Sequence, residues 1–143
     1  MNRFVLDTSF AFSWVIESER TPEGLALFDR MANEKVQAVV PALWPEEMAN
    51  VFLTVERAKK LSPDQVATWV EIFQHLPILI DPPSLPHSLG EVRLLAQKHG
   101  LSAYDARYLH LAIREKLPLA TGDKKLIKVA PHAGVELVTP HSP

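Results

Sequence analysis

Short apolar runs alternate along this chain with longer amphipathic segments, and this alternation constrains the fold more than any other feature. The runs have the length of buried strands and comprise residues 3–6, 36–40, 78–80, 118–121 and 135–138. Segments with helical spacing or helix-start signals lie between them, at residues 10–16, 21–31, 45–60, 62–75, 87–99, 102–116 and 123–129. Strands separated by helices imply a parallel sheet covered on both faces. We therefore predict a three-layer α/β domain.

Length and composition fit one globular domain. The chain has 143 residues, of which 47% are hydrophobic and 22% charged, a balance too apolar for a disordered chain. We assign residues 1–138 to the domain and residues 139–143 to a C-terminal tail. No apolar run approaches the roughly 20 residues of a membrane-spanning helix, and no signal-like stretch opens the chain, so we expect a cytoplasmic protein.

Several classes of site are excluded because their residues are missing. There are no cysteines, which rules out a disulfide framework, a thiolate zinc site and a cysteine nucleophile. The six histidines form no HxxxH or HExxH pattern, and neither a P-loop motif nor a dinucleotide-binding GxGxxG occurs. An aspartyl nucleophile at Asp7 would need a second acid two residues later, where the chain has Ser9.

Three of the six aspartates lie where parallel sheets bind ligands, at or near the carboxyl ends of strands. Asp7 ends the first strand, Asp123 follows strand 118–121, and Asp105 lies in the first turn of a helix. Each alone could cap a helix or complement its dipole, and Asp105 fits a capping box with Ser102. Together they would repel one another, a cost that is tolerable mainly if a cation neutralises it. Oxygen ligands of this kind favour Mg²⁺ or Mn²⁺.

A fourth acid comes from the helix predicted at residues 45–60. At 100° per residue, Glu47 lies at the border of this helix's apolar stripe, whereas Glu46 faces water. Asn50 is one turn from Glu47 on the same flank. We therefore predict that Glu47, and not Glu46, reaches the acidic site.

Four segments taken together resemble the conserved blocks of PIN-domain ribonucleases. They read VLDTS at residues 5–9, EMANV at 47–51, LSAYDA at 101–106 and LATGDKKL at 119–126. The similarity is closest to the VapC-type toxins of bacterial toxin–antitoxin systems, and it covers essentially the whole chain. It implies a three-layer α/β/α PIN-like domain with a central, mainly parallel five-stranded sheet. It also implies a Mg²⁺ or Mn²⁺ site, endonucleolytic cleavage of RNA, a cognate antitoxin and a homodimer.

The resemblance also implies roles for individual residues. The catalytic and metal-binding carboxylates would be Asp7, Glu47, Asp105 and Asp123. Polar residues around them would be Thr8, Ser9, Asn50 and Thr121. Gly122 stands where the family varies, so the match is loosest at Asp123. One or two bound ions would lower the pKa of a water molecule and stabilise charge on the phosphate oxygens.

The charge distribution adds candidate contacts to an RNA backbone. The net charge is −2, but Lys and Arg number 7 against 12 Asp and Glu up to Gly90, and 8 against 5 beyond it. The C-terminal third is therefore mildly basic, which slightly favours an anionic partner. Candidate phosphate contacts are Lys59, Lys60, Arg107, Arg114, Lys116, Lys124 and Lys125. For each of them the alternative is an ordinary solvated charge.

Two other functions stay open. The first is a PIN-type nuclease of RNA processing or decay that has no antitoxin. The second is a non-catalytic PIN-like domain that binds RNA or protein. The complete acid set favours an enzyme over a binding domain, and a small antitoxin gene beside this one would distinguish a toxin from a processing nuclease.

Overall fold

The computed structural model describes residues 2–138. Four strands form one sheet in the order β3-β2-β1-β4, and all paired strands are parallel. Their bounds are β1 Asn2–Leu6, β2 Val36–Pro41, β3 Ile78–Asp81 and β4 Leu119–Ala120. The predicted α/β class with a parallel sheet is thus confirmed.

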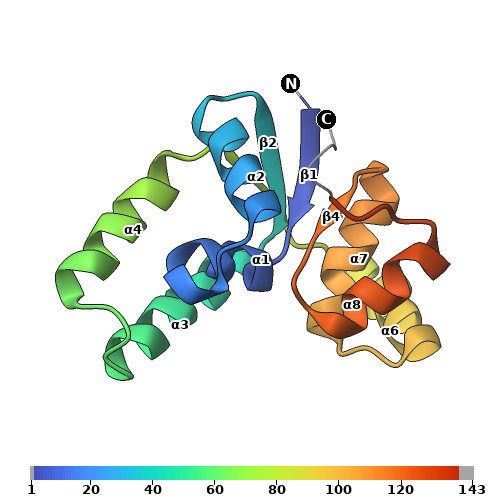
Figure 1. The fold of residues 1–143 in the computed structure, drawn as a ribbon. Coiled ribbons are helices and arrows are strands. Elements are labelled where there is room, and N and C mark those ends of the chain that lie inside the picture. Colours follow the sequence, from blue (N-terminus) through green and yellow to red (C-terminus); the bar gives the residue numbers. More distant parts are fainter. Residues whose placement is uncertain (1, 139–143) are drawn as a thin grey trace.

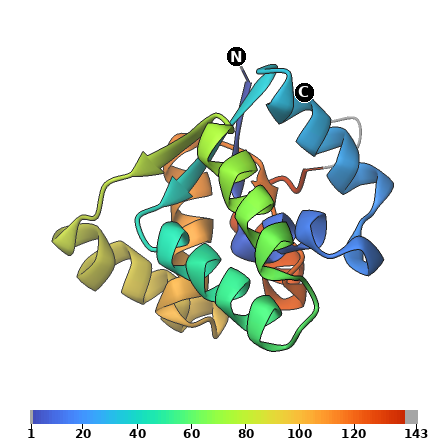
Figure 2. The same cartoon turned by 90° about the vertical axis from the view of Figure 1, so that its left-hand side faces the viewer.

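Helices cover both faces of the sheet (Figure 1). On one side lie α1 Thr8–Val15, α2 Pro22–Ala32, α3 Trp44–Arg57 and α4 Pro63–His75. The other side carries α6 Arg93–His99, α7 Ala103–Glu115 and α8 Lys124–Val129. Short turns of helix complete the chain, namely η1 Glu17–Glu19, α5 Leu85–His87, η2 Ser88–Val92 and η3 Ala130–Ala133. Figure 2 views the molecule from the first side, with α3 and α4 in front of the strands.

The prediction of five strands is wrong for the described residues, because the sheet has four. Residues 135–138 make only an isolated bridge between Leu137 and Leu119. The partner strand β4 is two residues long, since the chain turns away at Thr121 and Gly122. So short a strand offers few backbone groups for a further ladder. The predicted tail, residues 139–143, lies outside the described residues.

The helix predicted at residues 87–99 is also different. Helical structure begins earlier, at Leu85, where Ser84 caps it by accepting a hydrogen bond from the backbone N–H of His87 at 3.3 Å. It then passes through a π-helical turn at Ser88–Val92 before the regular helix α6. Such turns contain one extra residue and often occur at functional or strained positions. As predicted, Gly100 ends α6 in the left-handed conformation, with φ of 65°.

The core fixes the end of β1, from which the site is built. Val5 and Leu6 are fully buried in the sheet, and the next residues turn directly into α1. Trp14 anchors that helix, because its indole N–H donates to the carbonyl of Gly24 in α2 at 2.7 Å. The ring of Trp14 also packs against Phe28 and Phe73. The start of α1, and hence Asp7, is therefore held by rigid packing.

None of the helices in the part of the chain that the structure describes is long and apolar enough to cross a membrane.

Candidate active site

Asp7 is a buried carboxylate at the carboxyl end of β1. Its side chain is 6% exposed, and it does not cap α1, although it occupies the cap position. Its Oδ2 atom instead accepts hydrogen bonds from Ser9 at 2.7 Å and from Thr121 at 2.6 Å. The capping alternative is thus excluded for the side chain of Asp7. Two hydroxyls from distant parts of the chain hold its orientation.

Glu47 lies on α3 and faces α1 and α7. It is half-buried while Glu46 is exposed, as predicted from the helical stripe. Its Oε1 accepts hydrogen bonds from the hydroxyl of Tyr108 and from that of Thr8, the latter at 3.3 Å. The hydroxyl oxygens of Thr8 and Tyr108 lie 3.0 Å from each other. Three elements therefore meet at this carboxylate.

Asp105 and Asp123 both lie at helix starts. The hydroxyl of Ser102 accepts from the backbone N–H of Asp105 at 3.1 Å, so the predicted cap of α7 is present. Asp123 caps α8, since its Oδ1 accepts from the backbone N–H of Leu126 at 3.0 Å. Its own N–H donates to Thr121, the residue that holds Asp7. Asp123 is thus a cap and a neighbour of Asp7 at once.

All four carboxylates line one cleft of about 680 Å³ at the carboxyl edge of the sheet. Its walls include Thr8, Ser9 and Thr121, together with Phe10, Phe12, Ser13, Glu19, Thr21, Val51 and Gly122. The structure therefore brings together every predicted carboxylate and three of the four predicted polar neighbours. The fourth, Asn50, is exposed and lines an adjoining pocket.

Burial and neighbouring negative charges raise the pKa of Asp7, Glu47 and Asp105. Burial raises the pKa of Asp7, and the negative charges of Asp105 and Asp123 raise it further, against the lowering effect of its hydroxyl donors. Burial also raises the pKa of Glu47, and the charge of Asp7 adds to this. For Asp105 the causes are burial and then Asp123, with nearby Lys125 acting in the opposite direction. Such mutual repulsion is what a bound cation would relieve.

The donor set suits a hard divalent cation in its chemistry. All four groups are carboxylates, and none makes an ion pair with a cation among residues 2–138. Oxygen-only sites of this type select Mg²⁺ or Mn²⁺. Within the same residues, no three His, Asp or Glu side chains are already close enough together to hold one ion. Protein donors hold Asp7, Glu47 and Asp123 individually, and rotation of these side chains would be needed to enclose a metal.

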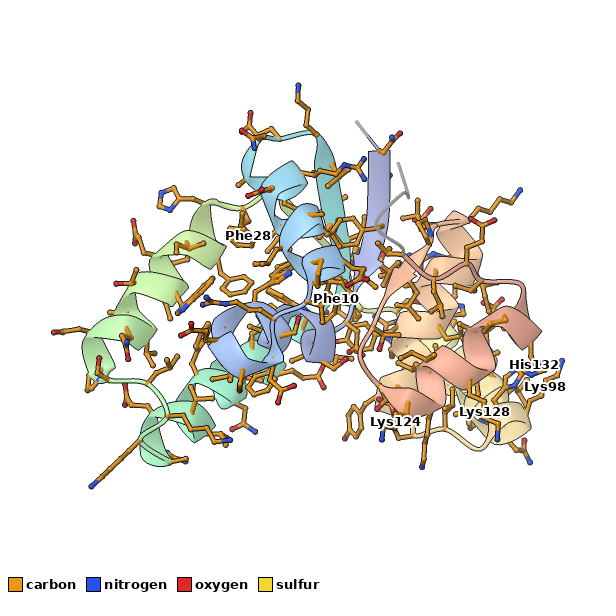
Figure 3. The ribbon with its side chains drawn as sticks, in the orientation of Figure 1. Phe10, Phe28, Lys98, Lys124, Lys128 and His132 are labelled. Carbon is orange, nitrogen blue, oxygen red and sulfur yellow. The ribbon has the colours of Figure 1, made fainter. Side chains whose placement is uncertain are left out.

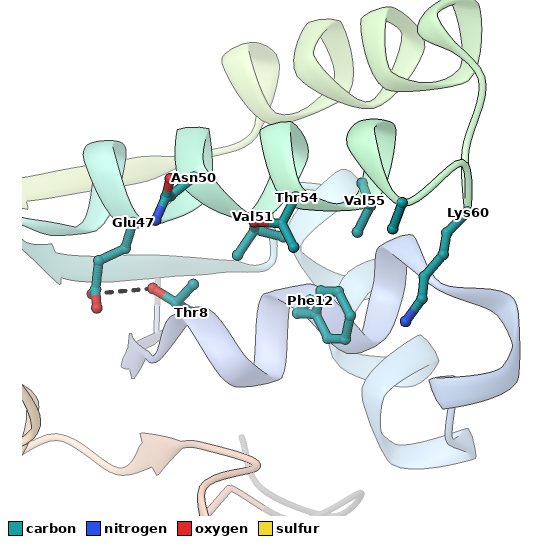
Figure 4. Close-up of a pocket in the computed structure, with 9 residues that line it drawn as sticks. Thr8, Phe12, Glu47, Asn50, Val51, Thr54, Val55 and Lys60 are labelled. Carbon is teal, nitrogen blue, oxygen red and sulfur yellow. Dashed lines mark hydrogen bonds between the residues drawn. The ribbon is translucent and has the colours of Figure 1, made fainter.

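A second pocket, of about 330 Å³, extends the cleft between α1 and α3 (Figure 4). It shares Thr8, Phe12, Glu47 and Val51 with the acidic cleft. Asn50 lies near Glu47, and Lys60 lies at the far end, beyond the ring of Phe12. The candidate phosphate contact Lys60 is thus within this extended groove.

Two predicted phosphate contacts have other partners. Arg107 and Arg114 lie on the face of α7 opposite Asp105, and both approach Asp81 at the end of β3, at 4.0 and 2.5 Å. Arg107 is 8% exposed, so the alternative of an ordinary solvated charge is wrong for this residue. Neither arginine lines the acidic cleft. Lys124 and Lys125, in contrast, are exposed directly after Asp123.

Sequence reasoning missed Tyr108. Its hydroxyl connects Thr8 and Glu47, and the burial of the ring raises the pKa of the phenol well above its usual range. The available signal was its spacing: three residues after Asp105 on a helix places Tyr108 on the same face. A tyrosine among apolar residues is also typical of a core position, so spacing alone does not identify it.

Comparison with known proteins agrees with this geometry. The model of the PIN domain family matches residues 4–131, so the chain belongs to the PIN-domain family. The family inferred from the four sequence blocks is thus confirmed. PIN domains are generally nucleases, and PIN nucleases generally use divalent metal ions. A comparison with curated proteins gives no match.

Two solved structures share the fold. PAE2754 from Pyrobaculum aerophilum is 23% identical, with a TM-score of 0.65 over 96% of this chain and 84% of that one. FitAcB from Neisseria gonorrhoeae is 22% identical, with a TM-score of 0.54 over 97% of this chain and 99% of that one. At these identities the comparison shows that the architecture is shared and nothing beyond it.

Proposed function

We propose that this protein is a metal-dependent endoribonuclease that uses Mg²⁺ or Mn²⁺. The observation that carries the proposal is the cleft that holds Asp7, Glu47, Asp105 and Asp123 with no compensating ion pair among residues 2–138. An arrangement that only stabilised the fold would pair these charges or leave them in water, because buried unpaired carboxylates cost free energy. Membership of a nuclease family supports the same interpretation.

In this proposal the four carboxylates bind the metal ion, and neighbouring hydroxyl groups orient them. Asp7, Asp105, Asp123 and Glu47 would hold the ion, while Ser9 and Thr121 orient Asp7. Thr8 and Tyr108 orient Glu47 in the same way, and Asn50 stands beside it at the entrance of the adjoining pocket. A divalent ion bound there would activate water and stabilise charge on the phosphate oxygens. The hydroxyls keep the carboxylates in place for that ion, as partners of metal ligands commonly do.

We further propose that the protein is the toxin of a toxin–antitoxin pair, acts in the cytoplasm and forms a homodimer. The resemblance of the four sequence blocks to VapC-type toxins supports the toxin and its antitoxin partner. The homodimer is supported by the exposed apolar side chains of edge strand β3 and the turns after it, with Leu79 45% and Ile80 49% exposed. An edge strand with exposed apolar side chains is a ready site for pairing with another chain. Light scattering of the purified protein tests the dimer.

Cleavage of a mixed RNA pool tests the proposed chemistry. We expect cutting with Mg²⁺ or Mn²⁺, none with EDTA, and none by the Asp105→Asn variant with metal present. The variant controls for traces of host ribonuclease, which would cut equally in both preparations. Cutting that persists in EDTA or in the folded variant would contradict the proposal.

A further inference from the structure

Three lysines and a histidine project from α8 and the turn that follows it. Lys124, Lys125 and Lys128 lie within the six residues of α8, and His132 follows in η3. All four side chains are exposed. Figure 3 shows Lys124, Lys128 and His132 along the same side of the molecule. We call these four residues the α8 basic surface.

The charges of this surface are not neutralised by ion pairs. None of its residues makes one among residues 2–138, and α8 contains no acidic residue. Lys124 and Lys128 are four residues apart, so two like charges stand side by side on the helix. Repulsion between like charges at this spacing destabilises an isolated helix. Its presence therefore favours a role in binding over a role in folding.

The α8 basic surface adjoins the acidic cleft. Helix α8 begins directly after Asp123, which lines the cleft and caps the helix. Lys125 is close enough to Asp105 to influence the ionisation of that carboxyl. Tyr104 directly precedes Asp105 in the sequence, and its side chain is 68% exposed. Exposed aromatic rings beside cations are a common means of binding single-stranded nucleic acid, because bases stack on them.

Without a metal ion the acidic cleft repels a polyanion, so RNA binding in that state depends on contacts outside the cleft. Contacts to phosphates supply most of the affinity in nucleic-acid complexes and position the strand. We propose that the α8 basic surface binds the phosphate backbone of single-stranded RNA beside the cleft, with Tyr104 as a stacking platform for a base. This inference rests on the proposed function, since it supplies the means by which that site holds its substrate.

Equilibrium binding of a fluorescent single-stranded RNA oligonucleotide, in EDTA to prevent cutting, tests the inference. We expect Lys124→Gln/Lys128→Gln to weaken binding and to reduce the slope of log K against log salt by up to about 1.4, or about 0.7 per lost phosphate contact. Lys124→Arg/Lys128→Arg should bind as the unaltered protein does. The control is Lys35→Gln, which removes an exposed charge directly before β2, at the opposite edge of the sheet. It should leave the slope unchanged.

Equal slopes for the two glutamine variants would overturn the inference, as would an absence of RNA binding by the unaltered protein at low salt. Tyr104→Ala should weaken binding without changing the slope, because stacking releases no counterions. Failure of the proposed nuclease function is distinguishable. RNA binding that depends on α8, in a protein that cuts no RNA with any metal, would overturn the nuclease and leave this inference standing.

Discussion

Two parallel strands of this sheet end in an aspartate, and the two aspartates have opposite surroundings. Asp81 at the end of β3 has Arg114 at 2.5 Å and Arg107 at 4.0 Å. Asp7 at the end of β1 has hydroxyl donors, and its charged neighbours Asp105 and Asp123 are also acidic. Among residues 2–138, Asp81 is therefore paired with arginine, whereas the carboxylate of Asp7 has no ion-pair partner.

Carboxyl pKa values also shift in opposite directions on the two sides of α7. On the Asp81 side of α7, the hydrogen bond from His110 holds the pKa of Glu91 below its ordinary value. In the cleft, burial and repulsion raise the pKa of Asp7, Glu47 and Asp105. Helix α7 contributes to both clusters from opposite faces. A carboxylate paired with arginines of the same chain stabilises the fold, whereas a buried carboxylate without such a partner points to a ligand.

The largest expected effect is on catalysis. Asp7→Asn should lower metal-dependent RNA cleavage by more than about 100-fold, since even residues that only support metal ligands are worth about 10–100-fold. The fold should persist, because the amide oxygen can still accept from Ser9 and Thr121. Cleavage rates and thermal unfolding of the same preparation measure both. Full activity, or an unfolded variant, would count against the role of Asp7.

The same change at the paired aspartate should act on stability. Asp81→Asn leaves two largely buried arginines without their carboxylate, and we expect a loss of about 3 kcal/mol in the free energy of unfolding. Asp105→Asn makes the same chemical change in the cleft and should cost little or nothing without metal. Urea unfolding of both variants in EDTA measures the difference. If Asp81→Asn and Asp105→Asn lower the free energy of unfolding equally, the proposed difference between the surroundings of Asp81 and the acidic cleft is wrong.

Tyr108 offers a smaller effect with a specific signature. Its hydrogen bond lowers the pKa of Glu47, so Tyr108→Phe should move the acidic limb of the pH–rate profile to higher pH. We expect activity at neutral pH to fall by roughly tenfold, the lower end for a residue that supports a metal ligand. A lower rate with an unshifted profile would indicate that Tyr108 serves packing alone.

The smallest expected effect is a change in the pH dependence of stability. The ordinary pKa is 3.8 for an aspartate and 4.5 for a glutamate, and in the folded protein the pKa values of Asp7, Glu47 and Asp105 lie above these. A carboxyl whose pKa is higher in the folded state binds its proton more tightly there. The free energy of unfolding therefore falls as the pH rises from the pKa of the unfolded state to that of the folded state. Without metal, we expect this loss from about pH 4 upward, and Asp7→Asn should reduce it.

Urea unfolding of the protein and of Asp7→Asn across this pH range provides the comparison. The contribution of Glu91, whose pKa is lowered and whose effect has the opposite sign, is common to both proteins and cancels in the difference. If the free energies of unfolding of the two proteins change with pH in parallel, the charge of Asp7 does not destabilise the folded state.

Much of the site was predictable because it depends on local rules. Strand ends and helix starts placed Asp7, Asp105 and Asp123 at one edge of the sheet, and helical geometry selected Glu47 over Glu46. The residues that contact these acids were harder to predict from the sequence. The Tyr108 hydroxyl and the pairing of Arg107 with Asp81 depend on packing between residues far apart in the sequence.

The errors in the fold have a similar origin. An apolar run at residues 135–138 has the pattern of a strand, but strand formation needs a partner, and β4 is only two residues long. The π-helical turn at Ser88–Val92 likewise leaves no clear signal in the spacing of apolar residues. Local patterns indicate which conformation a segment favours, and tertiary pairing decides how far it extends.

Calorimetry with Mn²⁺, without RNA, measures whether the cleft of Asp7, Glu47, Asp105 and Asp123 binds a divalent ion. The unpaired carboxylates should bind the ion, and Asp105→Asn should weaken the affinity by at least about tenfold. Glu46→Gln removes an exposed charge beside Glu47 and should leave the affinity unchanged. Absence of binding by the unaltered protein, or equal affinities for the two variants, would contradict the claim that this cleft is a metal site.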